Sequence, residues 1–206
     1  AKKIAAICLP HDWLSWRIAG YGPVAEGEDA HLEALFTDRS DASGTGYFEP
    51  VTNLYRRDIL AAALRIDEAA AARIVLPRIA GPSEVVGVGT LAGQPVKLGA
   101  GAGDNAGSAL GMGMTEGDVV VSIGTSGVVC GVSDVPSRDA TGLVSGFADA
   151  TGQYLPLACT LNGARVFDST ARLLGVAHNE LSDLALAAAP GAGGLVFVPF
   201  TEGERT

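Results

Sequence analysis

Two short polar segments in the middle of the chain could do chemistry together. Asp104 follows the glycine-rich run 99–103, and a Gly-Thr-Ser-Gly segment occupies 124–127. A carboxylate next to glycines has little to pack against, and glycines let a backbone come close to whatever it faces. The N–H groups and the two hydroxyls of such a turn form a concavity that suits phosphate oxygens. Together the two segments suggest a proton acceptor beside a phosphate site.

Both segments also have a structural explanation. Asp104 stands where it could cap a helix that begins near Ala106, and capping could be its whole purpose. The turn joins two β-branched runs, 118–123 and 128–132, which predicts a hairpin with a four-residue loop. From the residues alone, the chemical and the structural explanations both remain open.

Two common nucleotide-binding motifs are absent from the sequence. No GxxxxGK[ST] pattern occurs and no lysine lies near the turn, so the turn is not a Walker A loop. Gly99, Gly101 and Gly103 precede the aspartate without the strand–turn–helix frame of a dinucleotide fingerprint. Phosphate binding at this turn would therefore need a different kind of loop.

A carboxylate that follows one strand, with a GTSG hairpin opening the next unit, resembles the sugar-kinase branch of the actin and hexokinase ATPase superfamily. Within that branch, GDNAGSALGMG (103–113) and SIGTSGVV (122–129) are similar to the FGGY carbohydrate kinases. The form of the motif is most like that of the xylulokinase branch, because glycerol kinases usually have glutamine where Asn105 stands.

The resemblance implies an α/β, ribonuclease-H-like kinase of two domains. Residues 1–115 would be the end of the first, sugar-binding domain, and residues 116–206 the start of the second, nucleotide-binding domain. The ligands would then lie in the crevice between the domains. Asp104 and the turn 124–127 are expected to face that shared cleft, with the Asp104 carboxylate open to solvent.

The activity implied by the resemblance is ATP-dependent phosphorylation of a ketopentose, D-xylulose to xylulose 5-phosphate, with Mg²⁺. Asp104 would be the catalytic base and would contact the sugar together with Asn105. No residue of the chain is assigned as a metal ligand. The residues expected to contact the nucleotide are Gly124, Thr125, Ser126 and Gly163.

Three further segments resemble the same family. The first, LPHDWLSWRIAG (9–20), matches a pattern LPKDYLxxRLTG, with His11 at the lysine position. The second, TDRSDASGT (37–45), matches a signature in which Asp38, Ser40 and Asp41 would organise structure and not catalyse. The third, VFVPFTEGERT (196–206), stops before the last proline of a P-x-x-x-G-E-R-T-P pattern. We therefore expect an internal fragment that does not turn over by itself.

Composition sets broader limits on the function. The chain has 206 residues, of which 48% are hydrophobic and 6% aromatic, and this predicts a globular protein. Its 23 acidic and 14 basic residues give a net charge of −9, which argues against a nucleic-acid partner. No apolar run reaches about 18 residues, so we expect no membrane span. Cys8, Cys130 and Cys159 are odd in number and widely spaced, which predicts reduced core thiols in the cytoplasm.

Periodicity and punctuation residues predict the elements that must position these groups. Trp13, Trp16, Met112 and Met114 are expected in the core. Residues 21–36 are expected to form an exposed loop without metal-ligand spacing, and 37–50 a turn-rich loop. Extended chain is expected at 76–87 and a strand at 94–98. Helices are expected at 7–20 (with Pro10 in the first turn), 51–65, 67–73, 106–114, 160–175 (capped by Asn162) and 180–189 (capped by Asn179).

Two alternatives stay open. Another sugar kinase of the same family could act on gluconate, ribulose or a deoxy sugar. Alternatively, the chain could belong to a different class, as a non-catalytic ATPase-fold module that binds nucleotide or a partner. The absence of an N-terminal DxGTxS segment from the full-length protein would favour this module. The sequence leaves the oligomeric state open as well, with a homodimer as one option.

Overall fold

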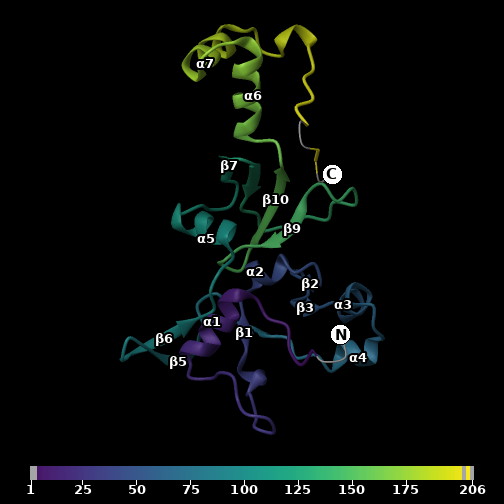
Figure 1. The fold of residues 1–206 in the computed structure, drawn as a ribbon, viewed down its shortest axis with the longest axis vertical. Coiled ribbons are helices and arrows are strands. Elements are labelled where there is room, and N and C mark those ends of the chain that lie inside the picture. The colour runs from purple at the N-terminus through teal and green to yellow at the C-terminus, as the bar shows by residue number, and fades with distance from the viewer. Residues whose placement is uncertain (1–3, 201–202, 205–206) are drawn as a thin grey trace.

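The computed structural model describes residues 4–200 and 203–204 of the chain. The molecule is elongated (Figure 1), with small helices and short strands of residues 4–99 at one end and a four-stranded sheet in the middle. Helices α6 (Ala164–Leu174) and α7 (His178–Ala187) form the other end. We call residues 4–99 the first part and residues 104–200 with 203–204 the second part.

The first part contains only short β pairings. Strands β1 and β4 pair in parallel, whereas β2 with β3 and β5 with β6 form antiparallel pairs. Its elements are α1 (Pro10–Ile18), η1 (Leu32–Ala34), β1 (Phe36–Thr37), α2 (Arg39–Ser43), β2 (Phe48–Glu49), β3 (Leu54–Tyr55), α3 (Arg57–Leu64), α4 (Glu68–Ala72), β4 (Arg78–Ile79), β5 (Val85–Leu91) and β6 (Gln94–Gly99).

Helix α1 forms where the sequence predicts it. Pro10 occupies the first helical turn, where its missing N–H costs nothing, and Gly20 follows the helix with φ +99°. Trp16 is buried as expected, but Trp13 is 51% exposed, so its placement in the core was wrong. Trp13 lies on the outer face of the helix, where the Arg17 guanidinium sits 5.9 Å from its ring.

The segment expected to be a loop at 37–50 contains helix α2, so that prediction was wrong. The Asp38 side chain accepts hydrogen bonds from the backbone N–H groups of Ser40 (2.6 Å) and Asp41 (3.2 Å), which caps the helix. Ser40 and Ala42 are buried. A helix of five residues is too short to show a helical periodicity, which explains why the sequence indicated only a loop.

Helix α3 starts later than the sequence predicts, whereas helix α4 lies where it is predicted. Helix α3 begins at Arg57, not at Val51, because residues 51–53 make a turn and β3 precedes the helix. Helix α4 lies inside the expected range, and the Asp67 side chain caps it by accepting from the Ala70 N–H at 2.7 Å.

The second part is built on one antiparallel sheet of order β7-β8-β10-β9. Val120 pairs with Cys130 across the predicted hairpin, which is confirmed. Its loop has three residues, 124–126, and not the expected four, because Gly127 already pairs with Ile123. Helix α5 lies next to this sheet (Figure 1). The elements of the sheet and the helices before and after it are α5 (Asp104–Gly111), β7 (Val119–Ile123), β8 (Gly127–Gly131), β9 (Ser145–Ala148), β10 (Tyr154–Thr160), α6, α7 and η2 (Ala192–Gly194).

Small residues of α5 pack directly on this sheet. Ala106 and Ala109 are each 3% exposed, and they share one apolar cluster with Cys130, Val132, Leu155 and Leu157. Met114 packs against the same cluster as expected, whereas Met112 is 57% exposed and was wrongly expected in the core. Helix α5 therefore belongs by its packing to the second part, although it precedes the domain boundary predicted at 115–117.

Several other details differ from the sequence predictions. Helix α6 is capped at Gly163 and α7 at Ala177, so Asn162 and Asn179 are not their caps. The three cysteines are free thiols, as expected; Cys130 is buried, but Cys159 is exposed and was wrongly placed in the core. Among the described residues, no helix has both the length and the apolar character that crossing a membrane requires.

The two parts touch through helix α2. The Ser43 Oγ accepts a hydrogen bond from the Ala148 N–H of β9 at 3.0 Å. The Arg39 guanidinium lies 5.6 Å from the Tyr154 ring of β10. These contacts hold β9 and β10 of the second sheet against helix α2.

Candidate active site

Asp104 is the first residue of helix α5. Gly103, not Asp104, is the N-cap, so the interpretation of Asp104 as a helix cap is wrong. The Asp104 Oδ1 accepts from the Asn105 N–H at 2.7 Å and from Asn105 Nδ2 at 3.0 Å. Its Oδ2 accepts no hydrogen bond from the described residues, and the residue is exposed. The carboxylate is thus open to solvent with one oxygen uncommitted.

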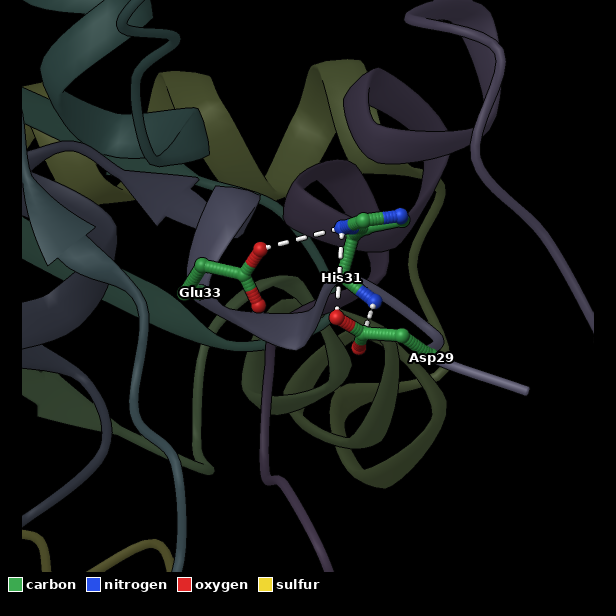
Figure 2. Close-up of side chains that lie close together, drawn as sticks. All are labelled: Asp29, His31 and Glu33. Atoms are coloured by element: carbon green, nitrogen blue, oxygen red, sulfur yellow. Dashed lines mark hydrogen bonds and ion pairs between the residues drawn. The ribbon is translucent and has the colours of Figure 1, made fainter. Parts of the chain in front are cut away.

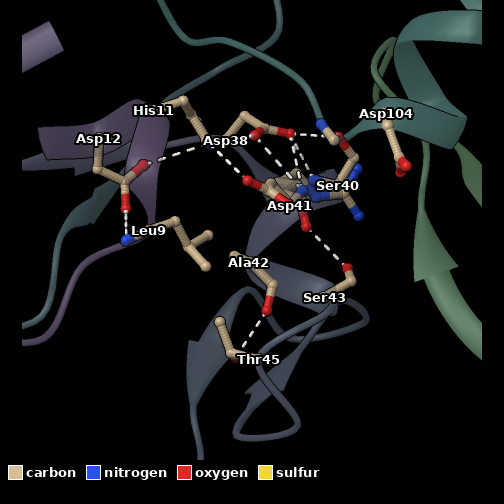
Figure 3. Close-up of polar contacts among 12 residues, drawn as sticks. Leu9, His11, Asp12, Asp38, Ser40, Asp41, Ala42, Ser43, Thr45 and Asp104 are labelled. Carbon is tan, nitrogen blue, oxygen red and sulfur yellow. Dashed lines mark hydrogen bonds and ion pairs between the residues drawn. The ribbon is translucent and has the colours of Figure 1, made fainter. Parts of the chain in front are cut away.

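Three further carboxylates gather around one histidine (Figure 3), and Asp104 lies near enough to one of them, Asp41, to act on its charge. His11 Nε2, on α1, lies 2.9 Å from Asp41 Oδ2, 3.3 Å from Asp12 Oδ1 and 3.5 Å from Asp38 Oδ1. We call these five residues the carboxylate cluster. Its members come from α1, from the β1–α2 junction and from α5, so only the fold brings them together.

The charges of the carboxylate cluster are unbalanced. Asp12 and Asp38 are 1% and 4% exposed. Burial raises the pKa of Asp12 above its ordinary value, although the Leu9 N–H, which donates to its Oδ2 at 2.7 Å, opposes the shift. Burial also raises the pKa of Asp41; His11 opposes that shift, while the negative charges of Asp38 and Asp104 add to it. Such electrostatic strain is common where proteins bind or transform ligands.

Glycines allow the chain before Asp104 to reach this cluster. A Cβ on Gly101, which has φ +91°, would lie 2.8 Å from His11 Nδ1. A Cβ on Gly103 would lie 3.3 Å from the Asp41 Cα. The close approach expected from the glycine run is therefore real, and its target is the backbone of α2 and the ring of His11.

The turn 124–127 docks on the start of α6. The Gly124 carbonyl accepts from the Ala164 N–H at 2.7 Å, and the Thr125 carbonyl accepts from the Gly163 N–H at 3.1 Å. Because the C=O and N–H of one trans peptide unit point in opposite directions, the N–H groups of Thr125 and Ser126 point away from α6. Both residues are exposed, and within the described residues neither these N–H groups nor the two hydroxyls are committed to a partner.

Gly163 is explained by this docking. A Cβ at this position would lie 2.5 Å from the Gly124 carbonyl oxygen and 2.6 Å from the Ser126 carbonyl carbon. A glycine is required here because the turn passes directly over the helix start. The expected contact of Gly163 with a nucleotide stays a prediction.

Glu204 holds the chain just before α6, a role that the sequence did not suggest. Its carboxylate accepts hydrogen bonds from Thr160 Oγ1, from the Leu161 N–H at 3.0 Å and from Asn162 Nδ2 at 3.1 Å. Asn162 Nδ2 also donates to the Gly203 carbonyl at 2.9 Å. The resemblance at 196–206 marked this segment but gave Glu204 no function.

A cavity of about 400 Å³ lies between the hairpin and α6, next to the turn. Most of its lining is apolar, and it includes Val121, Val129, Cys159, Val166 and Phe167. Asp104 is not among the residues that line it. The structure therefore gives the turn a neighbouring cavity but does not bring Asp104 into the same one.

The chain offers few ligands for a metal ion at these two segments. The turn presents hydrogen-bond donors, which suit phosphate oxygens, whereas Mg²⁺ requires about six oxygen ligands in an octahedron. Asp104 Oδ2 is the single uncommitted carboxylate oxygen described there. The donors of the turn fit a phosphate. Asp104 could supply at most one ligand to Mg²⁺, and the other ligands would have to come from the phosphates and from water.

One group outside these two segments does have metal-ligand spacing (Figure 2). Ligand atoms of Asp29, His31 and Glu33 all lie within 4.8 Å of one another, so the expectation of no such spacing at 21–36 was wrong. His31 Nδ1 lies 3.2 Å from Glu33 Oε1 and 3.5 Å from Asp29 Oδ2. All three residues are exposed, and an exposed ion pair explains the arrangement equally well.

Gly163→Ala should lower the stability of the chain. The added Cβ meets backbone atoms that cannot rotate away, so the turn must shift, at a cost of about 1–3 kcal/mol. Gly111→Ala is the matched control, since its Cβ would enter open space at the end of α5. Chemical denaturation of both variants checks this, and equal stabilities would contradict the docking of the turn on α6.

Asp41→Asn should raise the melting temperature at pH 7. A carboxyl whose pKa is raised on folding contributes stability below its unfolded pKa, about 3.9, and loses it as the pH rises through the folded value. The gain from Asn should therefore shrink as the pH falls toward 4. Melting curves from pH 4 to 8 test this, with the exposed Asp134→Asn as the control. An Asp41→Asn variant that melts below the wild type at every pH would refute the interpretation that the charge of Asp41 destabilises the folded carboxylate cluster.

No family model matches the chain. Over its full length it is 41% identical to a xylulose kinase of Streptomyces coelicolor and 40% identical to one of Streptomyces rubiginosus, and it covers 38% of each. The solved xylulose kinase of Bifidobacterium adolescentis matches 99% of the chain with a TM-score of 0.88 and 55% identity, over 43% of that structure. The chain thus spans about two fifths of the relatives it matches, and the predicted fold class is confirmed. The sequence and the fold of the chain are similar to those of xylulose kinases, and its fold is that of the FGGY carbohydrate kinases.

Proposed function

We propose that this chain is part of a kinase that transfers phosphate from ATP to a ketopentose, D-xylulose, to give xylulose 5-phosphate. The observation that carries the proposal is the Asp104 carboxylate, exposed at the first residue of α5 with one oxygen uncommitted. The names of the two Streptomyces relatives support the choice of substrate. The predicted division into a sugar domain, 1–115, and a nucleotide domain, 116–206, is part of the same proposal.

Asp104 is the base in this mechanism. It accepts the proton of the sugar hydroxyl that attacks the phosphoryl group, for which the two oxygens must come within about 2.6–3.2 Å. The N-terminal end of α5 favours the negative charge that Asp104 carries before it accepts the proton. Asn105 holds Oδ1 with two hydrogen bonds, which leaves Oδ2 to face the sugar.

The turn 124–127 holds the phosphates in the same mechanism. The N–H groups of Thr125 and Ser126 point away from α6, and their donors would bind oxygens whose charge changes during transfer. Gly163 contributes by letting the turn rest on α6. Bound Mg²⁺ would supply further charge neutralisation for the phosphates.

The proposal extends to the ligands of the protein and to its compartment. Sugar and ATP are the proposed ligands, and the net charge of −9 supports a protein without a nucleic-acid partner. Three free thiols support a reducing compartment such as the cytoplasm.

Asp104→Asn in the complete kinase should lower the turnover number by about 10²–10⁴-fold, because the proton acceptor is lost while the size of the side chain is kept. Sugar-dependent ADP formation measures this, together with melting curves. Glu26→Gln, an exposed acid-to-amide change elsewhere in the chain, is the control. Near-wild-type turnover by a normally folded Asp104→Asn enzyme would remove Asp104 from the mechanism.

Thr125→Ala should weaken the use of ATP more than the binding of sugar. The substitution removes one hydroxyl of the turn and leaves its backbone N–H in place, so we expect a rise in the KM for ATP with the KM for sugar nearly unchanged. The exposed Thr52→Ala serves as the control. If the KM for sugar rose and that for ATP did not, the turn would lie on the sugar side and the proposed division of roles would fail.

A further inference from the structure

The backbone just before Asp104 is held by one buried side chain of the first part. The Gly103 N–H donates to Ser40 Oγ at 2.9 Å, across 63 positions of the sequence. Ser40 is 2% exposed, and its partner Asp38 is 4% exposed. Figure 3 shows these side chains beside the start of α5, where Asp104 projects. The hydrogen bond therefore joins α2 to Gly103, the N-cap of helix α5, which begins with Asp104.

The hydrogen-bond direction at Ser40 is fixed by Asp38. An ionised carboxylate can only accept, so the Ser40 hydroxyl donates its single proton to Asp38 Oδ2. The Ser40 N–H donates to the same oxygen at 2.6 Å. The lone pairs of Ser40 Oγ are then left for the Gly103 N–H, and donation to a charged group strengthens Oγ as an acceptor. Asp38 thereby holds the Ser40 hydroxyl in the orientation that accepts from Gly103.

The Asp104 side chain contacts no other element through hydrogen bonds within the described residues, so its position depends on how the start of α5 is held. Its side chain bonds only to Asn105, the next residue along the chain. On the C-terminal side, Ala106 and Ala109 fix α5 to the sheet of the second part. On the N-terminal side, the first hydrogen bond to another element is the one from Gly103 to Ser40. The position of the carboxylate thus depends on two anchors that lie in different parts of the molecule.

We propose that Ser40, oriented by Asp38, is a positioning residue for Asp104. It acts through the Gly103 backbone and touches neither the sugar nor the phosphates. Its hydroxyl sets where α5 begins relative to the first part, and so where the base stands when the sugar hydroxyl approaches. The proposal rests on the proposed function of Asp104 as the base.

Ser43 provides a matched control on the same helix. Its Oγ donates to the Arg39 carbonyl at 2.7 Å and accepts from the Ala148 N–H at 3.0 Å. It therefore makes the same kind of bridge between the two parts but leads to β9, away from Asp104. A merely structural role for Ser40 predicts that Ser40→Ala and Ser43→Ala have similar effects.

The first test measures the anchor itself in this chain. Ser40→Ala leaves the Gly103 N–H without its acceptor, so amide hydrogen exchange at Gly103, followed by NMR, should become at least about 10-fold faster. Ser43→Ala should leave the exchange of Gly103 unchanged. Unchanged exchange in a folded Ser40→Ala variant would overturn the proposal.

The second test measures the consequence in the complete kinase. Ser40→Ala should lower kcat by about 10–100-fold, with the KM for sugar within about threefold of the wild type, because a displaced base slows the chemical step more than binding. Ser43→Ala should keep kcat within about threefold. Normal kcat in Ser40→Ala, while Asp104→Asn is inactive, would overturn the positioning role and leave the proposed function intact. Normal kcat in Asp104→Asn would instead overturn the proposed function.

Discussion

The start of helix α5 is held from two directions, and the geometry of the site depends on this double attachment. A hydrogen bond from Gly103 to Ser40 ties it to the first part, and the buried faces of Ala106 and Ala109 tie it to the second sheet. A larger side chain at 103 would meet the backbone of α2, and larger side chains on α5 would separate helix from sheet. Small residues therefore let one exposed carboxylate stand at the junction of the two parts.

Negative charge is buried near this junction, and its burial destabilises the folded chain. Three carboxylates crowd around His11, and burial raises the pKa of Asp12 and Asp41. Both oxygens of Asp38 accept hydrogen bonds from backbone N–H groups, those of Ser40 and Asp41, which lowers the cost of burying its charge. At Asp12 only Oδ2 is satisfied, by the Leu9 N–H, and the buried Oδ1 has no hydrogen-bond partner among the described residues. The turn 124–127 is held differently, by backbone hydrogen bonds from α6 to its carbonyl groups. The N–H groups of Thr125 and Ser126 therefore point away from α6. Charge is concentrated on the side of Asp104, and hydrogen-bond donors on the side of the turn.

The sequence predicted the features that local rules govern. The hairpin, helix α1 and the short helix that follows Asp67 are predicted from patterns of a few neighbouring residues. Helix α2 was missed because five residues show no period, and Trp13 and Met112 were misplaced because an apolar residue type does not say which face is covered. The cluster around His11, the contact of Gly163 with the turn and the anchor of Glu204 join residues far apart in the chain. No spacing rule within one sequence carries that information, although the family resemblance did mark each of the segments involved.

The central claim is that Asp104 and the turn 124–127 serve one reaction. A crystal structure of the complete kinase with D-xylulose and a non-hydrolysable ATP analogue tests it most directly. The account predicts an Asp104 carboxylate oxygen within about 2.6–3.2 Å of a sugar hydroxyl. It also predicts terminal phosphate oxygens that accept hydrogen bonds from the N–H groups of Thr125 and Ser126. A complex with both ligands bound, in which Asp104 bonds only to Asn105 and the turn touches no phosphate, would contradict it.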